Sequence, residues 1–142
     1  MHQTLAAVAA LAAVTLTLTG CSQLRQQTGD AWAVTYEDSV DAPDAGTLHD
    51  VRYLGAEQRG DAATTHTIPT ASTRPGAADG GAATWTHESI VLAKDPASVR
   101  ATPPAGQRAN CRILLDGTKV IADEHGIAGK PVRCRAQTPA FE

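Results

Sequence analysis

The amino-acid sequence predicts an all-β sandwich of about seven strands that follows a membrane-targeting segment. From residue 31 onward, short runs rich in Val, Ile, Thr, Tyr and Trp alternate with Gly, Pro, Asp and Asn, at spacings typical of an all-β domain. No run in this part has the 3.6-residue apolar period of a convincing helix. Short strands separated by turn residues favour two packed antiparallel sheets.

Length and charge limit the class of function. A chain of 142 residues is within the range of one domain. Its net charge is −3, its sequence pI is about 5.9, and it has no block of Lys or Arg that could neutralise a run of phosphates. We therefore expect no nucleic-acid partner.

The chain begins with an uncharged apolar run at residues 5–18. This run is shorter than the ~20 residues that span a bilayer, but it suits the core of a signal peptide. It ends in Leu18-Thr19-Gly20-Cys21, which resembles the bacterial lipobox, after which the cysteine receives a diacylglycerol and becomes the mature N-terminus. The preceding residues 1–4 lack the Lys or Arg that such signals normally carry. An ordinary signal peptide, or a chance cysteine beside an apolar helix, is the alternative interpretation.

This interpretation divides the chain into segments. Residues 1–20 are the expected lipoprotein signal peptide, and residues 21–30 are a polar tether that begins at the lipidated Cys21. A cysteine with more than one acyl chain is enough for stable anchoring. The sequence thus predicts a membrane partner through the lipid on Cys21, on the extracytoplasmic side of the cell membrane.

Eight runs are predicted as strands. In chain order they are residues 32–37, 48–54, 64–68, 84–93, 98–102, 110–115, 119–123 and 130–136. Two stretches rich in turn residues separate some of them, at 40–46 and at 70–83, and the second is predicted as a long flexible loop. The pair Asp116-Gly117 lies between two β-rich runs and predicts a type I′ hairpin, because both of its central residues tolerate positive φ.

The period-2 alternation of the runs selects the side chains that face the core. The core candidates are Trp32, Val34, Tyr36, Val51, Tyr53, Cys111, Ile113, Leu115, Val132, Cys134 and Ala136. Arg112, Arg133 and Arg135 point the opposite way from their apolar neighbours. These three form a candidate partner surface, a basic stripe able to meet an anionic lipid headgroup or an acidic partner. Ordinary solubilising charge is the alternative.

The cysteine count agrees with the lipobox. Three cysteines are an odd number for an exported protein, but a lipid on Cys21 leaves Cys111 and Cys134 to pair without remainder. We expect a disulfide between them, with two free thiols as the alternative. The bond would close a loop of about 24 residues and stabilise the fold by about 3 kcal/mol in the chain-entropy description.

The stretch between these cysteines resembles the C-terminal motif of the MmpS family of small mycobacterial and related actinobacterial membrane proteins. The matching residues are Cys111, Arg112, Ile113, Asp116, Gly117, Val132 and Cys134. Upstream, Tyr36-Glu37 and Tyr53 resemble parts of the first two strands of the family, and Trp85 stands near its Pro-Trp element without the Pro. The chain also differs from the family in having a lipobox in place of a transmembrane helix, and in its insert near residues 70–81.

The resemblance implies an immunoglobulin-like β-sandwich on the outer side of the membrane. Residues 31–138 would be the MmpS-like domain and 139–142 a C-terminal tail. The resemblance further implies that the protein is a non-enzymatic accessory to RND-type MmpL transporters, which export lipids and siderophores. The alternative from a different class is a free-standing envelope lipoprotein that binds a ligand or a cell-wall component through the sandwich.

No catalytic signature supports an enzyme. The sequence lacks Gly-x-Ser-x-Gly, a phosphate-binding loop with Lys-Ser or Lys-Thr, and a cysteine left free as a nucleophile. The histidines after the signal, His49, His66, His87 and His125, lack metal-binding spacing, so we expect no metal and no cofactor. The clusters His87-Glu88 and Asp123-Glu124-His125 are predicted as solvated surface, and an envelope hydrolase remains only a minor alternative.

Overall fold

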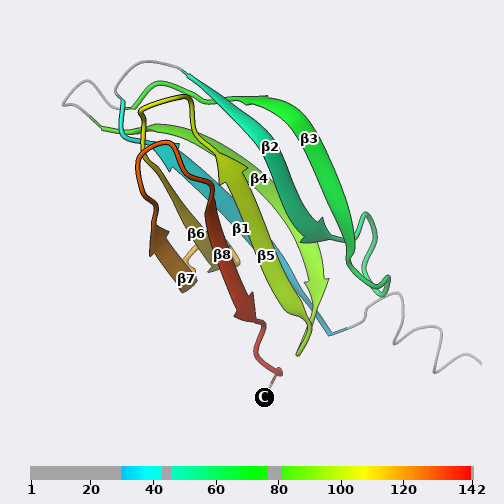
Figure 1. The fold of residues 1–142 in the computed structure, drawn as a ribbon. Coiled ribbons are helices and arrows are strands. Elements are labelled where there is room, and N and C mark those ends of the chain that lie inside the picture. The colour runs from blue at the N-terminus through cyan, green and yellow to red at the C-terminus, as the bar shows by residue number, and fades with distance from the viewer. Residues whose placement is uncertain (1–29, 43–45, 77–80, 142) are drawn as a thin grey trace, which may run out of the picture.

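The computed structural model describes residues 30–42, 46–76 and 81–141, and all of its regular elements are β-strands (Figure 1). The strands are β1 Ala31–Val40, β2 Thr47–Gly55, β3 Thr64–Ser72, β4 Ala83–Leu92, β5 Pro96–Thr102, β6 Ala109–Leu115, β7 Lys119–His125 and β8 Val132–Gln137. Each corresponds to one of the eight runs predicted from the sequence. The all-β fold class is confirmed.

The strands form two four-stranded antiparallel sheets that pack as a sandwich (Figure 1). One sheet has the order β4-β1-β6-β7 and is called sheet A here, and the other has the order β3-β2-β5-β8 and is called sheet B. Apart from the hairpins β2-β3 and β6-β7, the connections described between consecutive strands pass from one sheet to the other. The fold is immunoglobulin-like in its two antiparallel sheets and in the disulfide between them, with eight strands where about seven were expected.

The core lies between the sheets and is built from the side chains that alternate inward along each strand. Its largest fully buried apolar side chains are Tyr36, Leu48, Ile113, Leu115, Val34, Val40, Val51, Val91 and Val99. Trp32 and Tyr53 are partly buried and pack against this cluster. The described core residues all belong to residues 31–138. This part of the chain therefore provides both of the layers between which its apolar side chains are buried. We expect it to fold without residues 1–29.

Several predicted boundaries are wrong by a few residues for identifiable reasons. β1 continues through Asp38 to Val40 because Asp38 is buried in the strand and does not begin a turn. β3 continues past Pro69 to Ser72, which is permitted because β3 is an edge strand and Pro69 needs no partner on the open side. The predicted long loop is therefore shorter than residues 70–83. Arg74, in the connection after β3, also exchanges backbone hydrogen bonds of 2.8 and 2.9 Å with Thr84 on β4.

The predicted hairpin turn between β6 and β7 is confirmed. Asp116 and Gly117 have φ values of 49° and 68°, as a type I′ turn requires, and the Thr118 N–H donates to the Leu115 carbonyl at 3.0 Å. Asp50 also has a positive φ, of 49°, and lies where the pairing of β2 with β5 is irregular. Because of it, Leu48 and Val51 are both fully buried although they are an odd number of residues apart.

Candidate functional site

The anchoring residue predicted from the sequence, Cys21, lies outside the described residues, as do the expected signal peptide and most of the tether. Within the part of the chain that is described, no helix is long and apolar enough to cross a membrane. The predicted lipidation of Cys21 and the membrane location therefore remain predictions.

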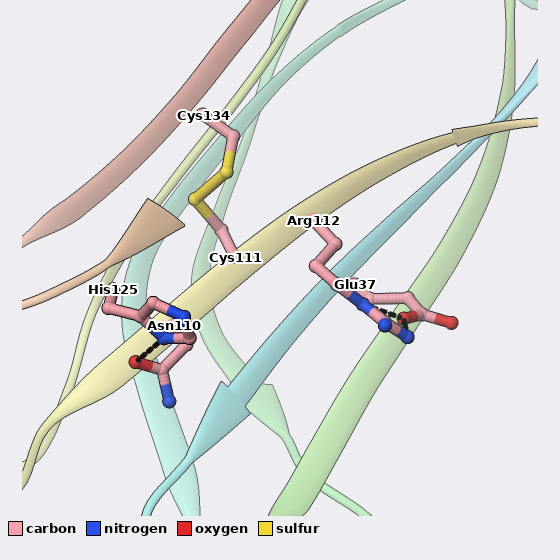
Figure 2. Close-up of a disulfide and its surroundings, with 6 residues drawn as sticks. All are labelled: Glu37, Asn110, Cys111, Arg112, His125 and Cys134. Atoms are coloured by element: carbon pink, nitrogen blue, oxygen red, sulfur yellow. Dashed lines mark hydrogen bonds and ion pairs between the residues drawn. A yellow bond between two sulfur atoms is a disulfide. The ribbon is translucent and has the colours of Figure 1, made fainter. Parts of the chain in front are cut away.

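The predicted disulfide is formed. Cys111 on β6 and Cys134 on β8 are joined, with their Cα atoms 5.9 Å apart, and both side chains are buried (Figure 2). Because β6 belongs to sheet A and β8 to sheet B, the bond ties the two layers together on one side of the sandwich. It also removes both cysteines as nucleophiles.

Arg112, the first member of the predicted basic stripe, lies on the outer face of sheet A. Its Nη2 and Nε atoms donate to one carboxylate oxygen of Glu37 at 2.7 and 3.1 Å (Figure 2). This hydrogen-bonded pair, with a further contribution from the charge of Asp123, raises the pKa of Arg112. Arg112 is thus matched by the acidic Glu37 and Asp123 and is not a source of uncompensated positive charge.

Arg133 and Arg135 lie elsewhere, on the outer face of sheet B. They alternate along β8 with the buried Val132 and Cys134, so their exposed side chains point away from the core. The single stripe of three arginines predicted from the sequence is therefore not formed, because β6 and β8 belong to different sheets. Arg133 and Arg135 have other arginine neighbours instead.

Four arginines converge on the outer face of sheet B, and we call this group the arginine face. It consists of Arg52, Arg100, Arg133 and Arg135. The register pairs Arg52 on β2 directly with Arg100 on β5, and Arg100 directly with Arg133 on β8. Three arginines thus stand in one row across three neighbouring strands. Like charges directly opposite each other destabilise a sheet, so this row carries a cost to the fold.

One carboxylate compensates part of this charge. Asp50 accepts from Arg52 Nε at 2.8 Å and from Arg100 Nη1 at 3.1 Å. Among the described residues, no acidic group lies within ion-pair distance of Arg133 or Arg135. The face encloses a shallow hollow of about 410 Å³, whose lining includes the four arginines and the hydroxyl-bearing Thr65 and Ser98. The arrangement fits an anionic group, because arginines offer bidentate hydrogen bonds to phosphate and carboxylate.

Sequence reasoning missed Arg52 and Arg100, although a signal for them exists. In Val51-Arg52-Tyr53 and Val99-Arg100-Ala101, as in the run around Arg133, an arginine stands between two inward-facing residues. The alternation alone places each arginine on an outer face. The alternation does not tell to which of the two sheets the arginine belongs, because Arg112 has the same local pattern and lies on the other sheet.

At the side of the sandwich opposite the disulfide, an aromatic cluster fills the space between β3 and β4. Tyr53 stacks on His66 with ring centres 5.0 Å apart and contacts His87 at 4.3 Å. His87 also lies parallel to Trp85 at 5.7 Å. Of the pair predicted as solvated surface, Glu88 is exposed, whereas His87 is partly buried by these ring contacts. Partial burial, together with the charge of His66, lowers the pKa of His87. No group of three or more metal-ligating side chains gathers in the described ranges.

Among the described residues, Asp38 is the one acidic residue that is buried, and sequence reasoning did not single it out. It lies in β1, fully buried, with the register placing it opposite Cys111 on β6 and Trp85 on β4. Neither of its carboxylate oxygens has a hydrogen-bond partner in the described part of the chain. Burial raises the pKa of the Asp38 carboxyl to about 7. It is enclosed in the core, so its effect is on stability and not on a substrate.

Comparison of the chain with protein-family models, with curated proteins and with solved structures finds no match.

Proposed function

We propose that this protein is a non-enzymatic lipoprotein of the cell envelope, held by Cys21 on the extracytoplasmic side of the membrane. The observation that carries the proposal is the distribution of its three cysteines. Two of them form the Cys111–Cys134 disulfide, and the third is the last residue of the lipobox Leu18-Thr19-Gly20-Cys21. Disulfides persist in oxidising compartments outside the cytoplasm, so the two features favour the same location.

Within this location, we propose a role as an MmpS-like accessory to RND-type export of lipids or siderophores. The support is the motif around Cys111 and Cys134 together with a two-sheet sandwich of the kind that the resemblance implies. The alternative is a free-standing envelope lipoprotein that binds an anionic ligand or cell-wall component. The hollow of the arginine face supports this second role.

Lipidation of Cys21 is tested by the intact mass of the protein extracted from membranes. We expect a chain that starts at Cys21 and carries a diacylglyceryl group, with a further acyl group on its amine, because the lipobox supplies the thiol that takes the lipid. A Cys21→Ser variant is the control, and we expect it to lack these masses. A mature wild-type chain that starts elsewhere, or that has an unmodified Cys21, contradicts the anchoring proposal.

The accessory role is tested by deleting the gene and measuring export of lipids and siderophores. We expect export to fall, and to be restored by the wild-type chain but not by Cys21→Ser, because an accessory to a membrane transporter must stay near the membrane. Unchanged export after deletion contradicts the accessory role and leaves the free-standing role in its place.

A further inference from the structure

We propose that the arginine face binds the surface of a bilayer that contains anionic phospholipids, so that the outer face of sheet B lies against the membrane. The proposal deepens the envelope-lipoprotein function and rests on it for the place where the domain works. The binding itself depends only on Arg52, Arg100, Arg133 and Arg135. This contact with the bilayer is additional to the one that the lipid on Cys21 would make.

Positive charge is concentrated on this face, although the protein as a whole is acidic. The whole protein has a net charge of −3, yet the arginine face brings four arginines together against the single carboxylate of Asp50. Direct pairing of Arg52 with Arg100, and of Arg100 with Arg133, is unfavourable for the sheet by itself. Anionic headgroups against the face would relieve this repulsion. Arg133 and Arg135, which have no acidic partner among the described residues, have the largest share of uncompensated charge.

The chemistry of the face favours a bilayer surface over an acidic protein. A specific protein interface has a desolvated centre rich in aromatic and apolar side chains. The lining of the hollow also includes Tyr53 and Leu54, but both are partly buried, and the large exposed apolar side chains of the described ranges, Val120, Ile127 and Phe141, lie outside it. Its lining adds the hydroxyls of Thr65 and Ser98, which can donate to phosphate oxygens. Positive charge and hydroxyl donors together are sufficient to bind the phosphates of lipid headgroups.

The short tether makes such a contact effective even when it is weak. Residues 22–30 separate Cys21 from the start of β1, and nine residues reach at most about 30 Å when fully extended. A lipid on Cys21 would thus hold the sandwich within about 30 Å of the headgroups, where the effective concentration of lipid is high. The arginine face then decides the orientation, with sheet B toward the bilayer and sheet A available to other proteins.

The test measures binding of the unlipidated chain to vesicles. The chain from residue 21 onward, with Cys21→Ser, is mixed with vesicles of phosphatidylcholine alone or with added phosphatidylglycerol, and the partition constant is measured by flotation. Each arginine near an anionic surface contributes about fivefold, so Arg133→Gln with Arg135→Gln should weaken binding to the anionic vesicles by about 30-fold. The matched control is Arg112→Gln with Lys119→Gln, which removes the same charge from sheet A.

We expect the wild-type chain and the matched control to prefer the anionic vesicles, and the preference to vanish as added salt screens the charges. Circular dichroism and the intact disulfide show that each variant is folded. Equal losses in the two double variants overturn the proposal, because net charge alone then explains binding. Equal binding to both vesicle types overturns it as well, and so does binding to soluble polyglutamate without binding to vesicles. Because the chain in this test lacks Cys21, failure to bind vesicles does not affect the proposal that Cys21 is lipidated. An unmodified Cys21 in the mass measurement likewise does not affect the binding of vesicles by the arginine face.

Discussion

Asp38→Asn is expected to make the protein more stable at pH 8, and its gain in stability over the wild type is expected to grow as the pH rises from 3.8 to about 7. The Asp38 carboxyl is fully buried between the sheets, and both of its oxygens lack partners in the described part of the chain. A buried charge without a partner is costly, and asparagine has nearly the same shape without the charge. At pH 8 the wild-type fold therefore carries the cost of a buried charge, whereas the variant carries only the smaller cost of a buried amide.

The pH range of this effect follows from the pKa of Asp38. Burial raises that pKa from its ordinary value of 3.8 to about 7. Below pH 3.8 the carboxyl is neutral in the folded and the unfolded chain, and it costs nothing extra. Between these two values the unfolded chain releases the proton first, so the free energy of unfolding falls as the pH rises. Above pH 7 the loss is complete, at about 4 kcal/mol for a shift of this size.

Urea unfolding followed by tryptophan fluorescence at several pH values checks this expectation. The quantity to compare is the free energy of unfolding of the wild type minus that of Asp38→Asn, since other titrating groups cancel in the difference. Asp61→Asn, at an exposed residue in the connection between β2 and β3, is the control, because it makes the same chemical change outside the core. Parallel curves for the wild type and Asp38→Asn would show that Asp38 is not the titrating group.

Replacing both Cys111 and Cys134 by alanine is expected to lower the free energy of unfolding by about 3 kcal/mol. The two cysteines are 23 residues apart, so the bond restricts a loop of that size in the unfolded chain. It also holds β6 of sheet A against β8 of sheet B. A loss of this size is a large share of the stability of a small domain.

Urea unfolding of the double variant beside the wild type measures this loss, and labelling of thiols counts free cysteines. In the chain with Cys21→Ser, we expect no labelled thiol until the protein is unfolded and reduced. Cys111→Ala alone is a useful comparison, because it breaks the bond and leaves one thiol at Cys134 in the core. A double variant that unfolds at the same urea concentration as the wild type would show that the sheets do not depend on the bond.

Local patterns were enough to predict the strands and the hairpin turn, whereas the cysteine pair followed from the number of cysteines left after the lipobox. The strands and the turn depend on neighbouring residues, such as the tolerance of Asp116-Gly117 for positive φ or the alternation around Cys111. The errors in the boundaries have identifiable causes. The predicted run 32–37 ended before Asp38 because acidic side chains rarely lie in a core, and the run 64–68 ended before Pro69 because proline is tolerated only where a strand lies at an edge, which depends on the whole sheet.

The candidate site could not be predicted in the same way, because it depends on which strands are neighbours. Arg52, Arg100 and Arg133 are far apart in the sequence and meet only because the sheet has the order β3-β2-β5-β8. Arg112 has the same alternation and was grouped with Arg133 and Arg135, yet it lies on the other side of the molecule. Alternation determines inside and outside, whereas the sheet to which a strand belongs is decided by packing over the whole chain.

The strand order has a consequence for a chain that is delivered N-terminus first, from a ribosome or across a membrane. β1 arrives before any other strand, but its two neighbours are β4 and β6, and Cys111 has no partner until β8 follows at the other end of the domain. Such non-local pairing folds slowly and leaves strand edges open in the meantime. The domain therefore stays incomplete until almost its last residues have emerged, and the Cys111–Cys134 bond can form only after β8 has followed.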